Sequence, residues 1–211
     1  MSFRAAILAI APVCALLSPA LYSSALHAQS GMEPAEQLLI PFSAEEWGNW
    51  KVGAQAKRPG LTMVEYIPKG QAIETWDRIL TVQIFHRLPI RLADFMGRMK
   101  ANFESQQPCD QTALNIVETK QVNGYDASLY RLTCTRNKQT GKGEFTFMLG
   151  IQGRDALYLV QRAWRGKGYA ADAAPLSKAE LKAWQDFVGK VEVCDPRAAE
   201  HPCPSGLKRA R

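Results

Sequence analysis

Four runs of alternating apolar and polar residues follow one another between Thr112 and Arg165, in the stretch TALNIVETKQVNGYDASLYRLTCTRNKQTGKGEFTFMLGIQGRDALYLVQRAWR. In the run EFTFMLGIQ, from Glu144 to Gln152, phenylalanine, leucine and isoleucine occupy every second position. Successive side chains of a strand point to opposite faces, so this alternation marks a strand with one buried face. The stretch therefore predicts four consecutive antiparallel strands, over residues 112–122, 125–136, 144–152 and 156–165.

The segments between these runs have the composition of turns. Asn123-Gly124 separates the first two runs, and both residues tolerate the positive φ of a type I′ turn. The polar, glycine-containing segment 138–143 and Gly153-Arg154-Asp155 separate the others. The sequence therefore predicts an antiparallel meander with short connections.

Three further strands are predicted upstream, over residues 50–57, 61–67 and 78–87. After Pro89 the apolar period changes to that of a helix, with a buried stripe of Leu92, Phe95, Met96, Met99 and Phe103. A second helix begins at Ser177, which forms a capping box with Glu180. We therefore expect an α+β fold in the order β-β-β-α-β-β-β-β-α. It contains one antiparallel sheet of about six to seven strands, flanked by two main helices.

Residues 1–28 have the pattern of an export signal. Arg4 supplies a positive charge, and an apolar run over 5–17 is too short for a membrane anchor. Small residues follow, and cleavage is expected after Ala25 or Ala28. A retained anchor is the alternative, but Pro12 interrupts the run and Pro19 follows it. The sequence therefore predicts a periplasmic or secreted protein with no stable membrane span after processing.

The remainder divides into an N-terminal extension over 29–46, a single α+β domain over 47–193 and a basic tail over 194–211. The chain of 211 residues has a net charge of +6. A moderate positive charge favours contact with anionic polymers of the cell surface or lipid headgroups, and the alternative is an ordinary solvated basic surface. The expected partner is another envelope protein or an anionic surface component. No basic-aromatic motif or zinc finger indicates nucleic-acid binding.

Four cysteines follow the signal: Cys109, Cys134, Cys194 and Cys203. An even number in an exported chain indicates two disulfides. Three pairings are possible, and we favour the pairs closest in sequence, 109 with 134 and 194 with 203. A two-residue turn at 123–124 places Cys134 opposite Ala113, so the chain must bend back near Cys109 for the first bond. No Cys-x-x-Cys occurs, and we expect no metal site.

The predicted element order resembles the PsbP-like α/β fold of the photosystem protein PsbP, the Ran-binding Mog proteins and several bacterial envelope proteins. The stretches EYIPKG (65–70) and WDRILTVQIF (76–85) also resemble a group of uncharacterised exported proteobacterial proteins. The resemblance implies a binding or assembly factor without catalysis. Some bacterial members are lipoproteins, and Val13 before Cys14 departs from a lipid-attachment site.

No catalytic or cofactor motif is present. There is no Gly-x-Ser-x-Gly, and the glycine-lysine-glycine segments are too short for phosphate loops. We therefore predict a non-catalytic periplasmic or secreted binding or assembly module without a cofactor. One alternative is an envelope hydrolase that uses His86 or a pair of carboxylates. Another is a carrier that holds a small apolar ligand between Met96, Met99 and the sheet.

Aromatic and charged residues gather at the start of the third predicted strand and the end of the last. We call this set the rim cluster: Trp76, Asp77, Arg78, Arg162, Trp164 and Arg165. If the two strand ends meet, the cluster lines one rim and binds an anionic ligand or an acidic segment of a partner. The alternative is that the tryptophans pack at the edge of the core and the arginines pair with carboxylates.

Overall fold

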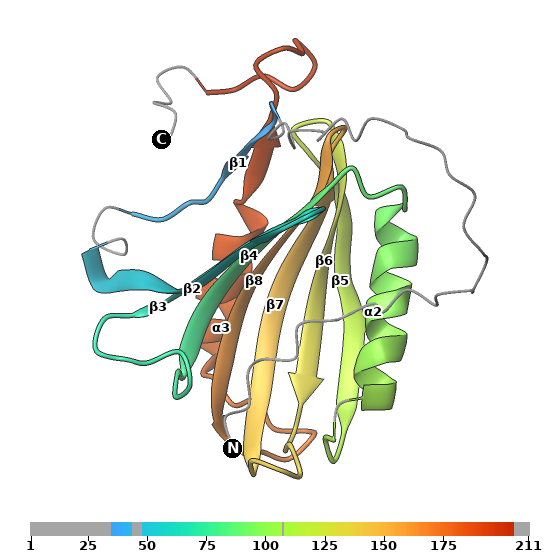
Figure 1. Cartoon of the computed structure of the whole chain (residues 1–211). Helices are drawn as coiled ribbons and strands as arrows, with labels where there is room; N and C mark the ends of the chain where they lie inside the picture. The colour runs from blue at the N-terminus through green and yellow to red at the C-terminus, as the bar shows by residue number, and fades with distance from the viewer. Residues whose placement is uncertain (1–34, 44–47, 107, 205–211) are drawn as a thin grey trace, which may run out of the picture. The chain divides into compact units, whose positions relative to one another are not determined.

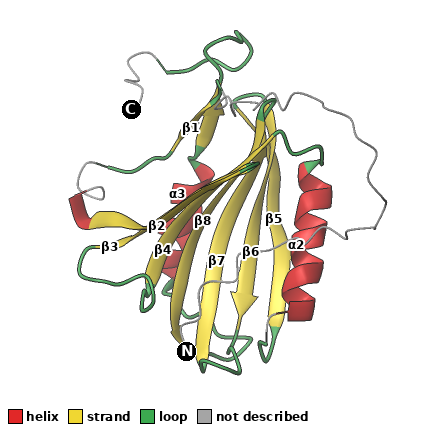
Figure 2. Ribbon diagram, in the orientation of Figure 1, coloured by secondary structure: helices red, strands yellow, loops and turns green. Residues whose placement is uncertain are grey.

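The computed structural model describes residues 35–43, 48–106 and 108–204. The predicted export signal and the end of the basic tail lie outside these ranges. A seven-stranded antiparallel sheet and two helices form the body, which confirms the predicted α+β class (Figures 1 and 2). The sheet order is β2-β3-β4-β8-β7-β6-β5. The strands are β2 (Trp50–Arg58), β3 (Leu61–Pro68), β4 (Arg78–His86), β5 (Thr112–Val122), β6 (Tyr125–Cys134), β7 (Lys142–Gln152) and β8 (Ala156–Lys167).

The two helices, α2 (Leu92–Gln106) and α3 (Lys178–Gly189), cover opposite faces of this sheet (Figure 1). On the α3 face, Phe147 and Leu149 belong to a core cluster that includes Trp184 and Val188 of the helix. On the α2 face, Met148 lies between them in sequence and packs with the apolar stripe of α2. Strand alternation thus divides the core into two layers. Within the described ranges, neither helix is long and apolar enough to cross a membrane.

The hairpin between β5 and β6 has the predicted turn, with φ of 48° at Asn123 and 81° at Gly124. Its register differs from the expected one, because a β-bulge between Ile116 and Glu118 adds one residue to β5. Cys134 therefore lies opposite Thr112, and the expectation that it faces Ala113 is wrong. The bulge brings Cys134 one residue closer to the preceding bend.

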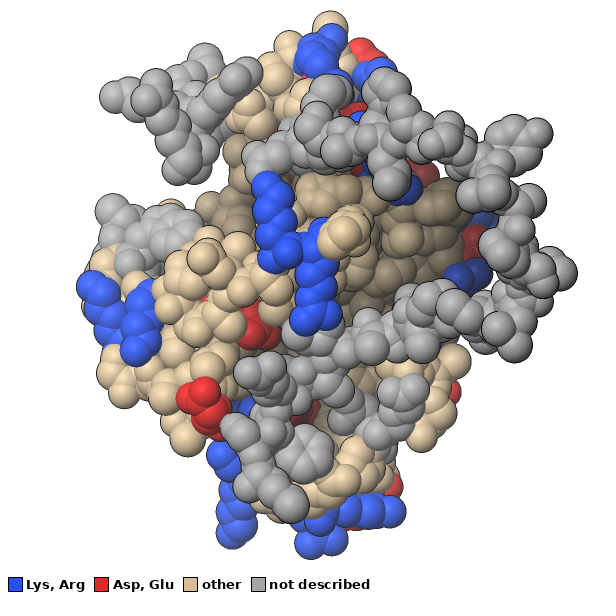
Figure 3. Space-filling view, in the orientation of Figure 1, with Lys and Arg blue, Asp and Glu red and all other residues tan. Residues whose placement is uncertain are grey.

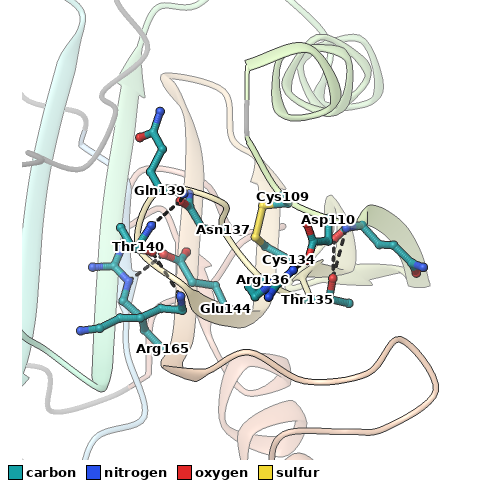
Figure 4. Close-up of a disulfide and its surroundings, with 12 residues drawn as sticks. Cys109, Asp110, Cys134, Thr135, Arg136, Asn137, Gln139, Thr140, Glu144 and Arg165 are labelled. Atoms are coloured by element: carbon teal, nitrogen blue, oxygen red, sulfur yellow. Dashed lines mark hydrogen bonds and ion pairs between the residues drawn. A yellow bond between two sulfur atoms is a disulfide. The ribbon is translucent and has the colours of Figure 1, made fainter.

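Two disulfides join the predicted cysteine pairs, Cys109 with Cys134 and Cys194 with Cys203. At the first, the Cα atoms are 5.6 Å apart, and Cys109 lies in a β-bridge with Asn137 that turns the chain back toward the sheet (Figure 4). Disulfides persist in oxidising compartments. The structure therefore fits an extracytoplasmic protein.

A second, two-stranded sheet pairs β1 (Gln37–Leu39) with β9 (Glu192–Cys194). The hairpin tip at Asn123 donates side-chain hydrogen bonds to the carbonyls of Val193 and Pro202. The N-terminal extension and the start of the tail are therefore attached to the body through this small sheet. No strand was predicted for either segment.

Candidate functional site

The start of β4 and the end of β8, which carry the rim cluster, lie side by side, and Arg78 faces Trp164 across the two strands. The cluster nevertheless does not line one rim, because consecutive residues of a strand alternate between its faces. Arg162 and Trp164 lie on the α3 face. Arg165 lies on the other face, above Trp76. The expectation of a single rim is therefore wrong.

On the α3 face, the arginines of the cluster contact aromatic rings of the helix. The guanidinium carbon of Arg162 lies 4.6 Å from the ring centroid of Phe187 and 5.1 Å from that of Trp184. Arg78 lies 5.5 Å from the Trp184 ring and pairs with Glu180 at 3.3 Å. Cation–π contacts of this kind hold α3 against the sheet.

On the α2 face, the guanidinium carbon of Arg165 lies 3.9 Å from the ring centroid of Trp76, and its Nη2 lies 2.7 Å from Oε1 of Glu144. Trp76 is buried, and Asp77 exchanges hydrogen bonds with the side chain of Gln71. These contacts give Trp76, Asp77 and Arg165 a structural role in packing and in hydrogen bonding within the fold. Their role in binding a ligand stays a prediction.

A cleft of about 350 Å³ lies on the α3 side, between β5, β6 and the segment 169–175 that connects β8 to α3. We call it the connector cleft. Phe145, three alanines of the segment and Pro175 contribute apolar surface. The polar residues that line it are Gln111, Thr112, Asn115, Arg131, Thr133, Thr135, Tyr169 and Asp172.

Arg131 is the most distinctive residue of the connector cleft. It lies opposite Asn115 of β5 and Phe147 of β7, and Phe147 in turn lies opposite Arg162. Arg131 is exposed and makes no ion pair or hydrogen bond with any residue that the structure describes; the same holds for Asp172. The cleft therefore contains one positive and one negative side chain that do not neutralise each other.

Tyr169 fixes one end of the connecting segment. Its backbone N–H donates to the carbonyl of Thr135, and its hydroxyl donates to the carbonyl of Glu144. Burial, together with the nearby Glu144 carboxylate, raises the pKa of Tyr169 to about 12, so the hydroxyl remains a donor at neutral pH. A Cβ at Gly143 would lie 2.6 Å from the tyrosine ring, so a glycine at that position is what admits the ring.

Arg131 is not among the predicted site residues, although the sequence of β6 carries a signal for it. Alternate residues of this strand face the α3 core, and Tyr125, Ala127 and Leu129 are buried there. Arg131 is the next residue on that face and is exposed. A charged residue that interrupts the apolar face of a central strand indicates either that the core ends at that position or that a ligand binds there.

The two described histidines make different contacts. His86 Nε2 lies 2.8 Å from the hydroxyl oxygen of Thr62. His201 stacks on Tyr125, with ring centroids 3.8 Å apart, and its Nδ1 lies 2.8 Å from the carbonyl oxygen of Asn123. In the described part of the chain, no group of three or more His, Cys, Asp or Glu side chains is arranged to hold a metal ion.

Charge is otherwise dispersed. On the face shown in Figure 3, the Lys and Arg side chains occur in several separate groups rather than one continuous basic patch. Many arginines pair locally, as Arg136 does with Asp110 at 2.6 Å beside the first disulfide (Figure 4). Binding of an anionic ligand would therefore depend on a specific arginine rather than on a continuous basic surface.

The loop closed by the second disulfide contains a buried carboxylate, Asp195. Arg197 donates hydrogen bonds to it and also pairs with Asp155 at 2.8 Å, in the turn between β7 and β8. The hydrogen bonds from Arg197 lower the pKa of Asp195 to about 2. The pair thus ties the tail to the main sheet.

This lowered pKa predicts acid sensitivity. Asp195 binds a proton less readily in the folded chain than in the unfolded one, so the ion pair stabilises the fold above about pH 4. That contribution is lost as the pH falls from about 4 to about 2. Arg197→Gln should lower stability at pH 7 and should flatten the pH dependence in this window, as measured by urea unfolding. An Arg58→Gln control should leave both unchanged.

No family model matches the sequence, and no curated protein matches it. Among solved structures, the chain is similar to PA94, a Pseudomonas aeruginosa protein of unknown function. The two are 17% identical, with a TM-score of 0.36, over 63% of this chain and 79% of that one. It is also similar to LpqN, which is involved in cell envelope biogenesis of Mycobacterium tuberculosis. Here the identity is 10% and the TM-score 0.36, over 79% of this chain and 87% of that one.

At these identities and TM-scores, neither likeness carries an argument about what the chain does. Neither protein is described as PsbP-like, so that resemblance stays a prediction. The side chains of the connector cleft are therefore the features from which we infer a function.

Proposed function

We propose that the protein is an exported, non-catalytic binding module of the periplasm or the extracellular space, and that the connector cleft recognises an anionic group of its ligand. The partner is another envelope protein or an anionic component of the cell surface. Arg131 is the residue that binds the anion.

The observation that carries this proposal is that Arg131 lines a cleft but has no ion-pair or hydrogen-bond partner among the described residues. Many guanidinium groups of the fold stack on aromatic rings or pair with carboxylates, as Arg165 does with Glu144. Arg131 has no such partner among the described residues, yet it lines a cleft with other hydrogen-bonding side chains. An arginine presents a planar set of donors that suits carboxylates and phosphates. Its free donors are therefore available to a ligand.

The proposal is tested by capture of envelope components on the immobilised full chain, compared with Arg131→Glu. The charge reversal should abolish capture of a specific component, because it places two negative groups against each other. Arg58→Glu is the matched control: Arg58 is also exposed, but it ends β2 at the opposite edge of the sheet. It should retain capture.

Equal capture by Arg131→Glu and Arg58→Glu would contradict the proposal. The paired variant Arg162→Ala, Arg165→Ala examines the rim cluster in the same assay. If that variant alone loses capture while remaining folded by circular dichroism, the anion site is the rim cluster and not the connector cleft.

A second candidate function is favoured by the contact between Thr62 and His86. A hydroxyl 2.8 Å from an imidazole nitrogen is the distance of a nucleophile from its general base. An envelope hydrolase built on this pair should turn over one member of a panel of ester, glycan and peptide substrates. Both His86→Ala and Thr62→Val should then lose the activity. Turnover that depends on both residues would favour this function over the binding module.

A further inference from the structure

The connector cleft contains two unneutralised charges of opposite sign. Arg131 projects from β6, and Asp172 belongs to the connecting segment. Neither makes an ion pair or hydrogen bond with a described residue, and they do not pair with each other. A ligand that is complementary to both must carry a negative and a positive group.

We infer that the connector cleft binds a zwitterion, a small molecule or chain end that carries both a carboxylate and an ammonium group. This inference rests on the proposed function, because it uses the same arginine. The carboxylate lies against Arg131, and the ammonium group lies against Asp172.

The donors around Arg131 favour a carboxylate at that end. Asn115 lies directly opposite Arg131 in the β5–β6 register, and Thr133 follows two residues later on the same face. Within the described residues, neither side chain has a hydrogen-bond partner. The guanidinium group binds the two carboxylate oxygens side by side, while the amide and the hydroxyl donate from the flanks.

Asp172 excludes more highly charged anions. A phosphate monoester carries about −1.5 to −2 charges at pH 7. Such a group would be repelled by the Asp172 carboxylate, whereas an ammonium group would be attracted to it. Asp172 therefore favours a zwitterion over a phosphate, two ligands that Arg131 alone would bind equally.

The size of the cleft agrees with a small ligand. Its volume of about 350 Å³ lies near the lower end of the range for ligand pockets. The alanines and Pro175 of the connecting segment, with Phe145 on the sheet, provide an apolar surface for a short aliphatic portion. If the ligand is part of a folded protein, only an extended end of its chain would fit into the connector cleft.

The test is a titration of the full chain at low salt with glycine, β-alanine and 4-aminobutyrate, whose two charges are separated by increasing distances. Acetate, ethylamine and inorganic phosphate are the matched probes with one kind of charge. Binding is followed by NMR of the side-chain N–H groups. At least one zwitterion should bind about three- to fivefold more tightly than acetate, the increment of an exposed ion pair.

Two conservative variants separate the roles of the charged residues. Arg131→Gln should no longer bind either acetate or the zwitterions. Asp172→Asn should keep acetate, lose the preference for the zwitterion and bind phosphate more tightly. The control Glu74→Gln removes an exposed carboxylate of the β3–β4 connection and should change nothing.

The outcomes distinguish this inference from the proposed function. If acetate binds through Arg131 but no zwitterion binds more tightly, the inference is overturned and the anion site stands. If no probe binds and capture of envelope components is unaffected by Arg131→Glu, both are overturned. A peptide that ends in a C-terminal lysine carries a carboxylate and an ammonium group on its last residue. Its titration beside glycine shows whether the zwitterion is a free molecule or part of a chain.

Discussion

Glu36→Ala is expected to destabilise the protein by about 3–5 kcal/mol, because it leaves one buried hydroxyl and two partly buried N–H groups without their acceptor. The carboxylate of Glu36 accepts hydrogen bonds from the backbone N–H groups of Arg154 and Asp155, at 2.6 and 3.1 Å, and from the hydroxyl of Tyr158, at 3.0 Å. Glu36 is 4% exposed and Tyr158 is fully buried.

The contacts of Glu36 connect the chain just before β1 to the turn between β7 and β8. Burial, followed by the charge of Glu36, raises the pKa of Tyr158, so the hydroxyl remains a donor throughout the accessible pH range. A Cβ at Gly153 would lie 2.5 Å from the carboxylate, so the turn closely surrounds it. Loss of the acceptor should therefore also release the β1–β9 sheet.

Urea unfolding at pH 7 measures this effect, with Glu192→Ala as the control. Glu192 is an exposed acid on β9, and its removal should change stability by less than about 0.5 kcal/mol. Hydrogen exchange of Gln37–Leu39 should accelerate in Glu36→Ala but not in the control. Equal stability of the two variants would show that Glu36 does not attach the N-terminal segment.

Removal of the first disulfide, by Cys109→Ser with Cys134→Ser, is the second large effect. The cysteines are 25 residues apart, so the bond should contribute about 3–4 kcal/mol through the lost entropy of the unfolded chain. The second bond spans nine residues, and its removal should cost about 2.5 kcal/mol by the same relation.

Guanidinium unfolding of the two double variants, each compared with the oxidised parent, measures the difference. The first bond should be worth more than the second. A loss below about 1 kcal/mol for Cys109→Ser with Cys134→Ser would contradict the assignment of a bracing role to this bond. Connectivity is checked separately by peptide mapping before and after reduction.

Local patterns in the sequence predict the body of the fold well. Alternation in Glu144–Gln152 and the Asn123-Gly124 turn specify strands and a hairpin from adjacent residues alone. The capping box of Ser177 and Glu180 also forms as predicted, at the start of α3. These signals are short-range, so they do not depend on tertiary contacts.

The features that were not predicted depend on distant segments. Strands β1 and β9 have three residues each, which is too short for a period to be detected. The bulge after Ile116 has no local signature of the kind that a turn has, and it alone moves Cys134 by one position. Register errors of one residue change which groups can meet.

The candidate site was predicted only in part for the same reason. The meeting of Arg78 with Trp164 follows from strand order, but alternation places Arg165 on the opposite face. The connector cleft is lined by both Arg131 and Asp172, which is 41 positions further along the chain. These two charges line the same cleft only because the fold places the segment after β8 next to β6.

Site-specific photo-crosslinking in cells tests the central claim most directly. A photoreactive side chain replaces Ala173, which lines the connector cleft, or Lys51, which is exposed on β2 at the other edge of the sheet. We expect a discrete adduct from position 173, detected by mass spectrometry, that disappears when Arg131→Gln is added. An adduct from 173 that persists in Arg131→Gln, or the same adduct from position 51, would contradict recognition through this arginine.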